Sequence, residues 1–231
     1  MIAIELSCLS ILALFLVMRT RGENDGHVVL RRLALMAVAG WLGEQTCIRL
    51  YGFYGYSASW SVFVGEVPLM IPLIWPVVIQ SAHDLSRSIA PRHVALFAGA
   101  VILADASLIE PIAVRAKLWS WTEPGLFDVP PIGVLGWAFF AAACVATFEW
   151  SDKKPLKQAL LRDVLVILVA PLATHVLLNA SWWGAMRWVS TPLRPEVAVA
   201  LAWTLSIGLA ILALRTEARR RVPPLLMWLR V

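Results

Sequence analysis

Long apolar runs, separated by short polar connections, dominate the amino-acid sequence. A helix that crosses a bilayer needs about 20 mostly apolar residues. Stretches of this kind occur at residues 2–18, 31–52, 65–86, 94–117, 132–149, 162–184 and 196–214. The pattern therefore predicts an all-α fold, in which residues 1–231 form a single integral membrane domain, a polytopic bundle of about seven transmembrane helices.

Basic residues are distributed unevenly between the two sides of this predicted bundle. The first, third and fifth connections and the C-terminal segment together hold fifteen of the 20 Lys and Arg residues. Because cytoplasmic loops carry an excess of positive charge, we expect the N-terminus outside and the C-terminus in the cytoplasm. The net charge of +5 then indicates contact with anionic lipid headgroups, and no nucleic-acid partner is needed to explain it.

Composition agrees with a membrane protein and narrows the chemistry. Hydrophobic residues make up 60% of the chain and the mean hydropathy is +0.75, whereas soluble domains are about 45–50% apolar. Cys8, Cys47 and Cys144 lie in apolar runs, at spacings that match no metal or redox motif. The sequence has no Gly-rich nucleotide-binding motif. We therefore expect neither a metal nor an organic cofactor.

Several polar side chains fall at membrane depth, where an ionisable residue is costly and usually functional. With a rise of about 1.5 Å per residue, Glu44, Asp105, Glu110, His175 and Asn179 fall near the middle or in the outer half of the bilayer, on three of the predicted helices. Buried ionisable residues normally face the bundle interior and pair with one another. The pattern therefore predicts one shared site at this depth.

Two local pairings offer simpler explanations for these residues. Asp105 and Glu110 are about 140° apart on an ideal helix, and they share a face only if the proline that follows Glu110 bends the helix. Glu110 could instead form an ion pair with Arg115. His175 and Asn179 lie one turn apart on one face, and they could hold two helices together by hydrogen bonds. The sequence leaves these alternatives open.

The connection between the fourth and fifth predicted helices is rich in tryptophan. Trp119 and Trp121 flank a single serine there. Indole rings favour the headgroup zone of a bilayer, so an aromatic belt is one interpretation, and the wall of a pocket for an apolar ligand is the other. The third predicted helix contains Pro68, Pro72 and Pro76 and cannot be straight. Such breaks often line a cavity.

The stretch from Asp105 to Trp137 carries a pattern that is shared with a known family. Its elements are Asp105, Glu110-Pro111, Trp119-Ser120-Trp121, Gly125, Phe127, Val129-Pro130 and Gly136-Trp137. Through them the chain resembles the carotenoid-biosynthesis integral membrane proteins of bacteria and archaea, which include bisanhydrobacterioruberin hydratases and carotenoid terminal-end hydratases. Two features depart from the pattern. Glu110 stands where the family usually has Asp, and residues 131–133 lack the Asn that usually follows Val-Pro.

The resemblance implies a cofactor-independent hydratase, a lyase, of the bacterial inner membrane, with a carotenoid or other long apolar isoprenoid as substrate. Acid-initiated addition of water to a terminal C=C bond needs a proton donor, a base for the water and a stabiliser for the carbocation. A carboxylic acid in a low-dielectric site can act as the donor, and indole faces stabilise cations. We expect Asp105 as acid and Glu110 as base, with Glu44, His175 and Asn179 completing the catalytic set and Trp119, Trp121, Trp137 and Phe127 binding the polyene.

Two other functions remain open. A carotenoid end-group cyclase or isomerase would begin with the same protonation, but its product would contain no added water. A non-enzymatic membrane protein that binds polyenes or lipids would tolerate Asp105→Asn and Glu110→Gln without a change in pigments. Besides the polyene, membrane lipid and other enzymes of the carotenoid pathway are the expected partners.

Overall fold

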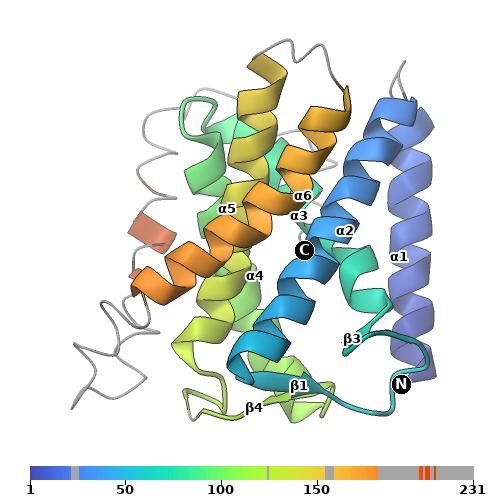
Figure 1. Cartoon of the computed structure of the whole chain (residues 1–231), viewed down its shortest axis with the longest axis vertical. Helices are drawn as coiled ribbons and strands as arrows, with labels where there is room; N and C mark the ends of the chain where they lie inside the picture. Colours follow the sequence, from blue (N-terminus) through green and yellow to red (C-terminus); the bar gives the residue numbers. More distant parts are fainter. Residues whose placement is uncertain are drawn as a thin grey trace.

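The computed structural model of the chain is a bundle of helices with a short ribbon of strands at one end (Figure 1). It describes residues 1–21, 26–123, 125–153 and 159–181, together with 203, 204, 206–208 and 211. The long helices of this part are α1 Ile2–Arg21, α2 Gly26–Tyr51, α3 Met70–Ile89, α4 Val94–Arg115, α5 Pro131–Lys153 and α6 Ala159–Leu178. Each is 20 to 26 residues long, the length that a bilayer core requires.

Helices α2 to α6 form a closed ring. Each packs against the next in chain order, and α6 returns to pack against α2, while α1 lies against α2 and α3. Ala39, Ala98 and Ala141 are completely buried in the core between these helices. Small residues of this kind let helix backbones approach closely, which is how helices associate in membranes. The interior of the ring can therefore enclose a site at membrane depth.

A two-stranded antiparallel ribbon lies across one end of the ring (Figure 1). Strand β1 (Tyr54–Tyr56) pairs with strand β4 (Trp119–Trp121), so that Tyr54 lies opposite Trp121 and Tyr56 opposite Trp119. Both strands alternate aromatic residues with a small one, and successive side chains of a strand point to opposite faces. The four aromatic rings consequently share one face of the ribbon, and the small residues are exposed on the other.

The predicted third span begins too early. A tight hairpin of β2 (Phe63–Val64) and β3 (Val67–Pro68) occupies the start of the range 65–86, and α3 begins only at Met70. Gly65 turns the hairpin with φ +66°, a conformation that glycine adopts readily. The chain is mostly helical, as the sequence predicts, and short strands of two or three residues add to the helices between α2 and α3 and in the Trp-rich segment.

Four helical segments are long and apolar enough to cross a bilayer: Ile2–Thr20, Val94–Arg115, Pro131–Lys153 and Leu160–Ser181. Helices α2 and α3 occupy two further predicted spans and are long enough to cross a bilayer, but they do not meet the same condition of composition. Most of the last predicted span, 196–214, lies outside the described residues. The chain is thus a helical membrane protein, while the count of seven spans and their orientation stay predictions.

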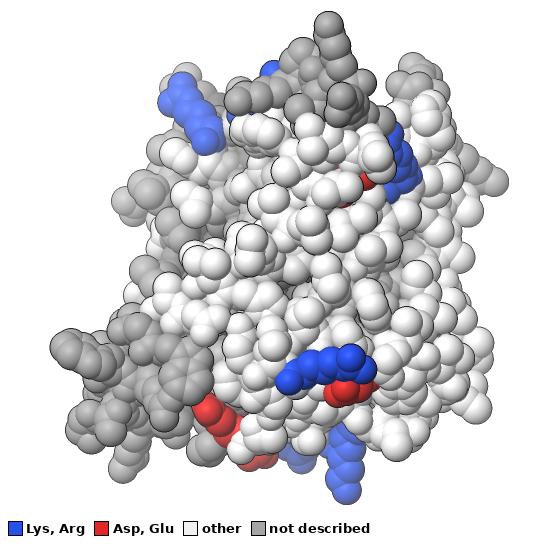
Figure 2. Space-filling view, viewed as in Figure 1, with Lys and Arg blue, Asp and Glu red and all other residues white. Residues whose placement is uncertain are grey.

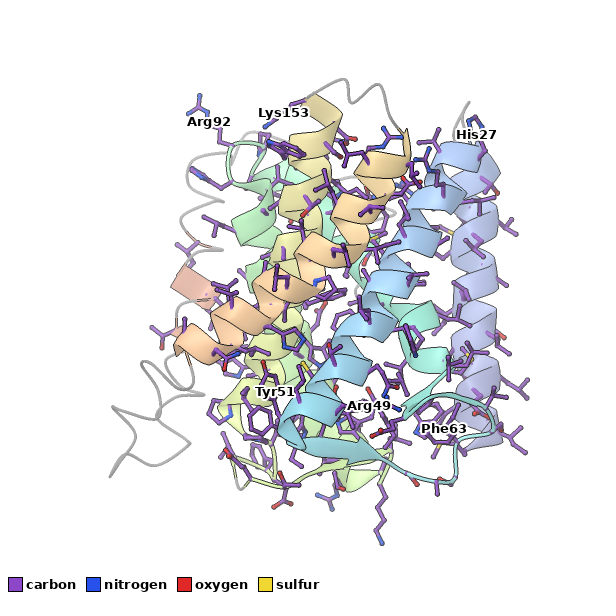
Figure 3. All side chains as sticks on the ribbon, in the orientation of Figure 1. His27, Arg49, Tyr51, Phe63, Arg92 and Lys153 are labelled. Carbon is purple, nitrogen blue, oxygen red and sulfur yellow. The ribbon has the colours of Figure 1, made fainter. Side chains whose placement is uncertain are left out.

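The surface has the charge distribution of a protein that crosses a bilayer. On the face shown in Figure 2, Lys, Arg, Asp and Glu gather at the two ends and leave an uncharged band between them. Figure 3 places His27, Arg92 and Lys153 at one end and Arg49 and Tyr51 at the other, on the side of the ribbon. Charged side chains avoid the hydrocarbon of a bilayer, so the band is suited to contact with lipid tails.

Candidate functional site

A cavity lies inside the ring of helices, next to the ribbon. It contains about 890 Å³ of atom-free space, its open mouth included. Residues from α2 to α6 and from β1 and β4 line it, and most of them are apolar or aromatic. Two carboxylic acids, Glu44 of α2 and Glu110 of α4, line it as well. An apolar wall with a few convergent polar groups is typical of a ligand site.

Glu110 is only 1% exposed, and three indole N–H groups satisfy its carboxylate. Trp119 and Trp121 of β4 donate to Oε2 at 2.7 Å and 3.0 Å, and Trp137 of α5 donates to Oε1 at 2.8 Å. A buried carboxylate is costly unless it is hydrogen-bonded, so these tryptophans explain how α4 carries an acid into the ring. They, rather than Arg115, are its partners, and Arg115 is exposed at the end of α4.

Glu44 has a matching set of three aromatic donors. The hydroxyls of Tyr54 and Tyr56 donate to Oε2, the second of them at 3.0 Å, and Trp75 of α3 donates to Oε1 at 3.2 Å. Burial, together with the charge of Glu44, raises the pKa of Tyr54 and Tyr56 well above its ordinary value. Both phenols therefore remain neutral hydrogen-bond donors at physiological pH.

The two carboxylates share one hydrogen-bond arrangement. An ionised carboxylate offers about four acceptor positions, two on each oxygen. In Glu44 and in Glu110 alike, Oε2 accepts two hydrogen bonds from these donors and Oε1 accepts one. Each acid thus keeps one acceptor position on Oε1 for a proton, a water molecule or a substrate atom.

Ring contacts join the donors of Glu44 to the donors of Glu110. Between ring centroids, Tyr54 lies 4.7 Å from Trp121, Tyr56 lies 5.8 Å from Trp119, and Trp75 lies 4.8 Å from Trp137. Aromatic pairs at such distances attract each other. Each contact pairs one donor from each set, and the register of β1 with β4 produces two of the three. These six rings form one aromatic cluster that holds both acids.

His175 of α6 lines the same cavity and is held by α2. Thr46 Oγ1 lies 2.7 Å from its Nε2, and the Tyr51 hydroxyl lies 2.9 Å from its Nδ1. Asn179 donates to the Tyr51 hydroxyl at 2.8 Å and to the backbone oxygen of His175, also at 2.8 Å. His175 therefore joins two helices and also reaches the cavity, so both interpretations of this residue describe part of its environment.

The structure gathers six of the nine proposed site residues around the cavity: Glu44, Glu110, Trp119, Trp121, Trp137 and His175. The other three lie elsewhere. Asp105 is half-buried on α4 but does not line the cavity, and Asn179 is exposed and meets the site through Tyr51. Phe127 is 71% exposed in the turn between β4 and α5. The proline after Glu110 does not bring Asp105 to the same cavity.

Three donors to Glu44 were not expected from the sequence: Tyr54, Tyr56 and Trp75. The tyrosines lie in the connection before the third predicted helix, to which the sequence assigned no role, and Trp75 lies in that proline-rich helix. One signal was present. The same aromatic–small–aromatic spacing occurs at 54–56 and at 119–121, and it is typical of strands with one aromatic face.

The polar groups of the cavity suit proton transfer. Among the described residues, no group of three or more His, Cys, Asp and Glu side chains is arranged to hold a metal ion. The groups present are two carboxyls, their phenol and indole donors, one imidazole, the Thr174 hydroxyl and the Cys47 thiol. Carboxyls can give up and take up protons, and aromatic faces attract a positive charge that forms beside them.

Comparison with known proteins agrees with the resemblance seen in the sequence. A family described as carotenoid biosynthesis protein matches the chain over residues 3–211. No curated protein and no solved structure matches. Apart from the first residue of α1, the matched range includes all the helices and strands named above, and therefore both carboxylates and the whole aromatic cluster.

Proposed function

The chain belongs to the carotenoid biosynthesis protein family, and from this premise we propose that it adds water to a terminal C=C bond of an acyclic carotenoid. The observation that carries the proposal is the pair of cavity carboxylates, Glu44 and Glu110, each held by three aromatic donors. An apolar cavity suits the end of a polyene, and two acids supply the proton transfers that the addition of water requires.

Glu44 is the proposed proton donor, the role that the sequence had assigned to Asp105. Two of its partners are the hydroxyls of Tyr54 and Tyr56, and a hydroxyl can both donate and accept. These hydroxyls can therefore relay a proton to Glu44 between turnovers. Asp105 does not line the cavity, so it has no direct contact with a substrate bound there.

Glu110 keeps its role as the base that takes a proton from water. Its three partners are indoles, which donate hydrogen bonds and cannot accept them. None of them can supply a proton to the carboxylate. The free position on Oε1 is therefore available for the attacking water molecule, and His175 at the edge of the cavity would help to orient it.

The reaction balances over these two acids. Glu44 gives its proton to the less substituted carbon of the terminal double bond, so that a C–H bond forms, the π bond breaks and a tertiary carbocation remains. The oxygen of water bonds to this cation, and a proton of the water passes to Glu110. Return of that proton to Glu44 through water or the tyrosine hydroxyls resets the site. The product is a tertiary alcohol.

The aromatic cluster would stabilise the carbocation. An aromatic face attracts a cation by about 0.5–1 kcal/mol at an exposed site and by about 2 kcal/mol or more when water is excluded. Several indole and phenol rings line this cavity, and both acids lie among them. The intermediate would thus form close to negative charge and to aromatic faces, where little water can reach it.

Expression in a host that accumulates lycopene tests the proposal. Pigments are separated and analysed by mass spectrometry, and the chain is expected to produce carotenoids that are heavier by one or two water molecules. A new pigment of unchanged mass would contradict hydration and indicate a cyclase or isomerase. An unaltered polyene that copurifies with the protein, without any new pigment from several acyclic substrates, would indicate a binding protein.

A further inference from the structure

Glycines of two kinds line the cavity. Gly40 and Gly43 belong to α2, and Gly133 and Gly136 belong to α5. Within each helix the two glycines are three residues apart and therefore neighbours on its surface. The four positions differ in how close a Cβ atom would come to its neighbours. Two of the glycines make room for a packed indole, and the other two leave room inside the cavity.

Gly40 and Gly133 are buried because an indole rests on each of them. A Cβ at Gly40 would lie 3.0 Å from Trp75, and a Cβ at Gly133 would lie 2.7 Å from Trp121. Each indole is a donor to one of the two carboxylates. These glycines therefore position the donors, and an asparagine at position 133 would collide with the ring of Trp121.

Gly43 and Gly136 border open space instead. The atom nearest to a Cβ at Gly43 belongs to the Phe140 ring at 3.8 Å, and the atom nearest to a Cβ at Gly136 belongs to Leu178 at 4.0 Å. Both are ordinary van der Waals distances, and both glycines are only half-buried. A methyl group would fit at either position, while a longer side chain would occupy part of the cavity.

The cavity is short compared with a carotenoid. Its lining extends from Ile71 to Val78 on α3 and from Ile132 to Phe140 on α5, which corresponds to about 10–12 Å along a helix. The hydrocarbon core of a bilayer is about 30 Å thick. A polyene long enough to span that core can place only one end in the cavity, and the rest of the chain has to remain outside.

We propose that Gly43 and Gly136 are specificity-determining residues, which set the width of the polyene end that can reach the acids. The inference rests on the proposed function. Gly43 directly precedes Glu44 in the sequence. Gly136 directly precedes Trp137, which donates to Glu110. A side chain at either glycine would narrow the space beside the reacting groups, and a branched polyene end would lose access before an unbranched one.

Competition between two acyclic carotenoids tests this proposal. Both end in an isoprene unit, but the branched carotenoid carries an additional substituent beside this unit and the unbranched one does not. Both are offered together to the purified protein. Gly43→Leu and Gly136→Leu are expected to lower the ratio of branched to unbranched conversion about tenfold or more. In an apolar pocket, a difference of even one carbon changes the discrimination between substrates by about this factor. The corresponding alanine variants should shift the ratio in the same direction by less.

Two glycines supply the controls. Gly208→Leu should leave the ratio unchanged, because nothing lies within 4 Å of a Cβ at Gly208. Gly40→Ala should lower both conversions together, because it displaces Trp75 from its position beside Gly40. A changed ratio therefore indicates a change in access to the cavity, whereas a joint loss of both conversions indicates damage to the hydrogen bonds of the acids.

The retention of each carotenoid by the purified protein is a second readout that needs no chemistry. The proposal is overturned if the ratio is unchanged in both the leucine and the alanine variants, regardless of how much of each carotenoid is converted or retained. If the wild-type protein retains both polyenes and converts neither, hydration fails, and the ratio retained by the variants still decides the role of the glycines. If it retains neither, both proposals fail.

Discussion

Tyr56 and Trp119 lie opposite each other in the β1–β4 ribbon, with ring centroids 5.8 Å apart, and they donate hydrogen bonds to different carboxylates. Tyr56 donates to Glu44 of α2, and Trp119 donates to Glu110 of α4. One strand pair thus fixes donors for two acids on two helices. The ribbon is therefore an integral part of the candidate site, and it does more than connect the helices at their ends.

Amide replacements of the acids should stop proton transfer while they keep the size of the side chain. Glu44→Gln and Glu110→Gln are each expected to lower the rate of hydration by about 10²–10⁴-fold, the usual contribution of a general acid or base. Asp105→Asn is the matched control, because Asp105 does not line the cavity, and its rate should stay close to that of the wild type. A loss in Asp105→Asn as large as in Glu44→Gln would show that the proton donor is wrongly assigned.

Removal of a single indole N–H tests whether the hydrogen bond to the carboxylate contributes to the rate in addition to the aromatic ring. Trp137→Phe keeps an aromatic ring but loses the hydrogen bond to Glu110, which is worth about 1.5–3 kcal/mol when the acceptor is charged. We expect a fall in rate of about 10- to 100-fold. Trp60→Phe is the control, because Trp60 is buried even more deeply than Trp137 but donates to the backbone oxygen of Leu118. Equal losses in the two variants would argue against a role for the N–H.

The tyrosines give an optical test of the site. The chain has three tyrosines, so Tyr51→Phe leaves only Tyr54 and Tyr56 to contribute to the tyrosinate absorbance. Burial, together with Glu44, raises the pKa of both phenols. The absorbance should therefore rise only at a pH well above the ordinary midpoint of tyrosine, which is about 10. The neutral phenols stabilise the fold fully below that pH, and their contribution is lost as the pH rises through the raised values.

Glu44→Gln in the same background should lower this midpoint, because it removes a nearby negative charge, but burial should keep the midpoint above the ordinary value. A midpoint near pH 10 in the Tyr51→Phe protein with Glu44 intact would mean that the two phenols are open to water, and the described contact with Glu44 would then be wrong.

Gly65 should be sensitive to any side chain. It adopts φ +66° in the β2–β3 turn, where a residue other than glycine costs roughly 1–2 kcal/mol. A Cβ would also meet the side chain of Gln45, which accepts a hydrogen bond from the backbone of Glu66 at 2.8 Å. Gly65→Ala is expected to lower the Tm of the purified protein by several degrees. Gly55→Ala, where nothing lies within 4 Å of a Cβ, should change it little, and equal Tm values would contradict the prediction.

Depth in the membrane could be predicted from the sequence, but rotation about a helix could not. The helical rise places Glu44, Glu110 and His175 at similar levels, and buried ionisable residues face the interior, so their convergence was expected. Asp105 and Glu110 point in directions about 140° apart. Only the tryptophans of β4 and α5, which surround Glu110, decide which of the two faces the cavity.

The partners of Glu44 were beyond prediction for another reason. Tyr54 and Tyr56 take their positions from the pairing of β1 with β4, which joins segments that are far apart in the chain and depends on tertiary context. Trp75 can approach Glu44 because Gly40 has no side chain. The alternating aromatic residues mark each strand separately, but neither the pairing of the two strands nor the approach of Trp75 to Gly40 leaves a local signal in the sequence.

The origin of the added oxygen tests the central claim most directly. Purified protein and an acyclic carotenoid are incubated in buffer made with isotopically labelled water, in the absence of molecular oxygen, and the product is analysed by mass spectrometry. We predict a tertiary alcohol with one labelled oxygen per hydrated end, formed by the wild type and not by Glu44→Gln or Glu110→Gln. A product without labelled oxygen, or a labelled product formed equally well by both variants, would contradict the account.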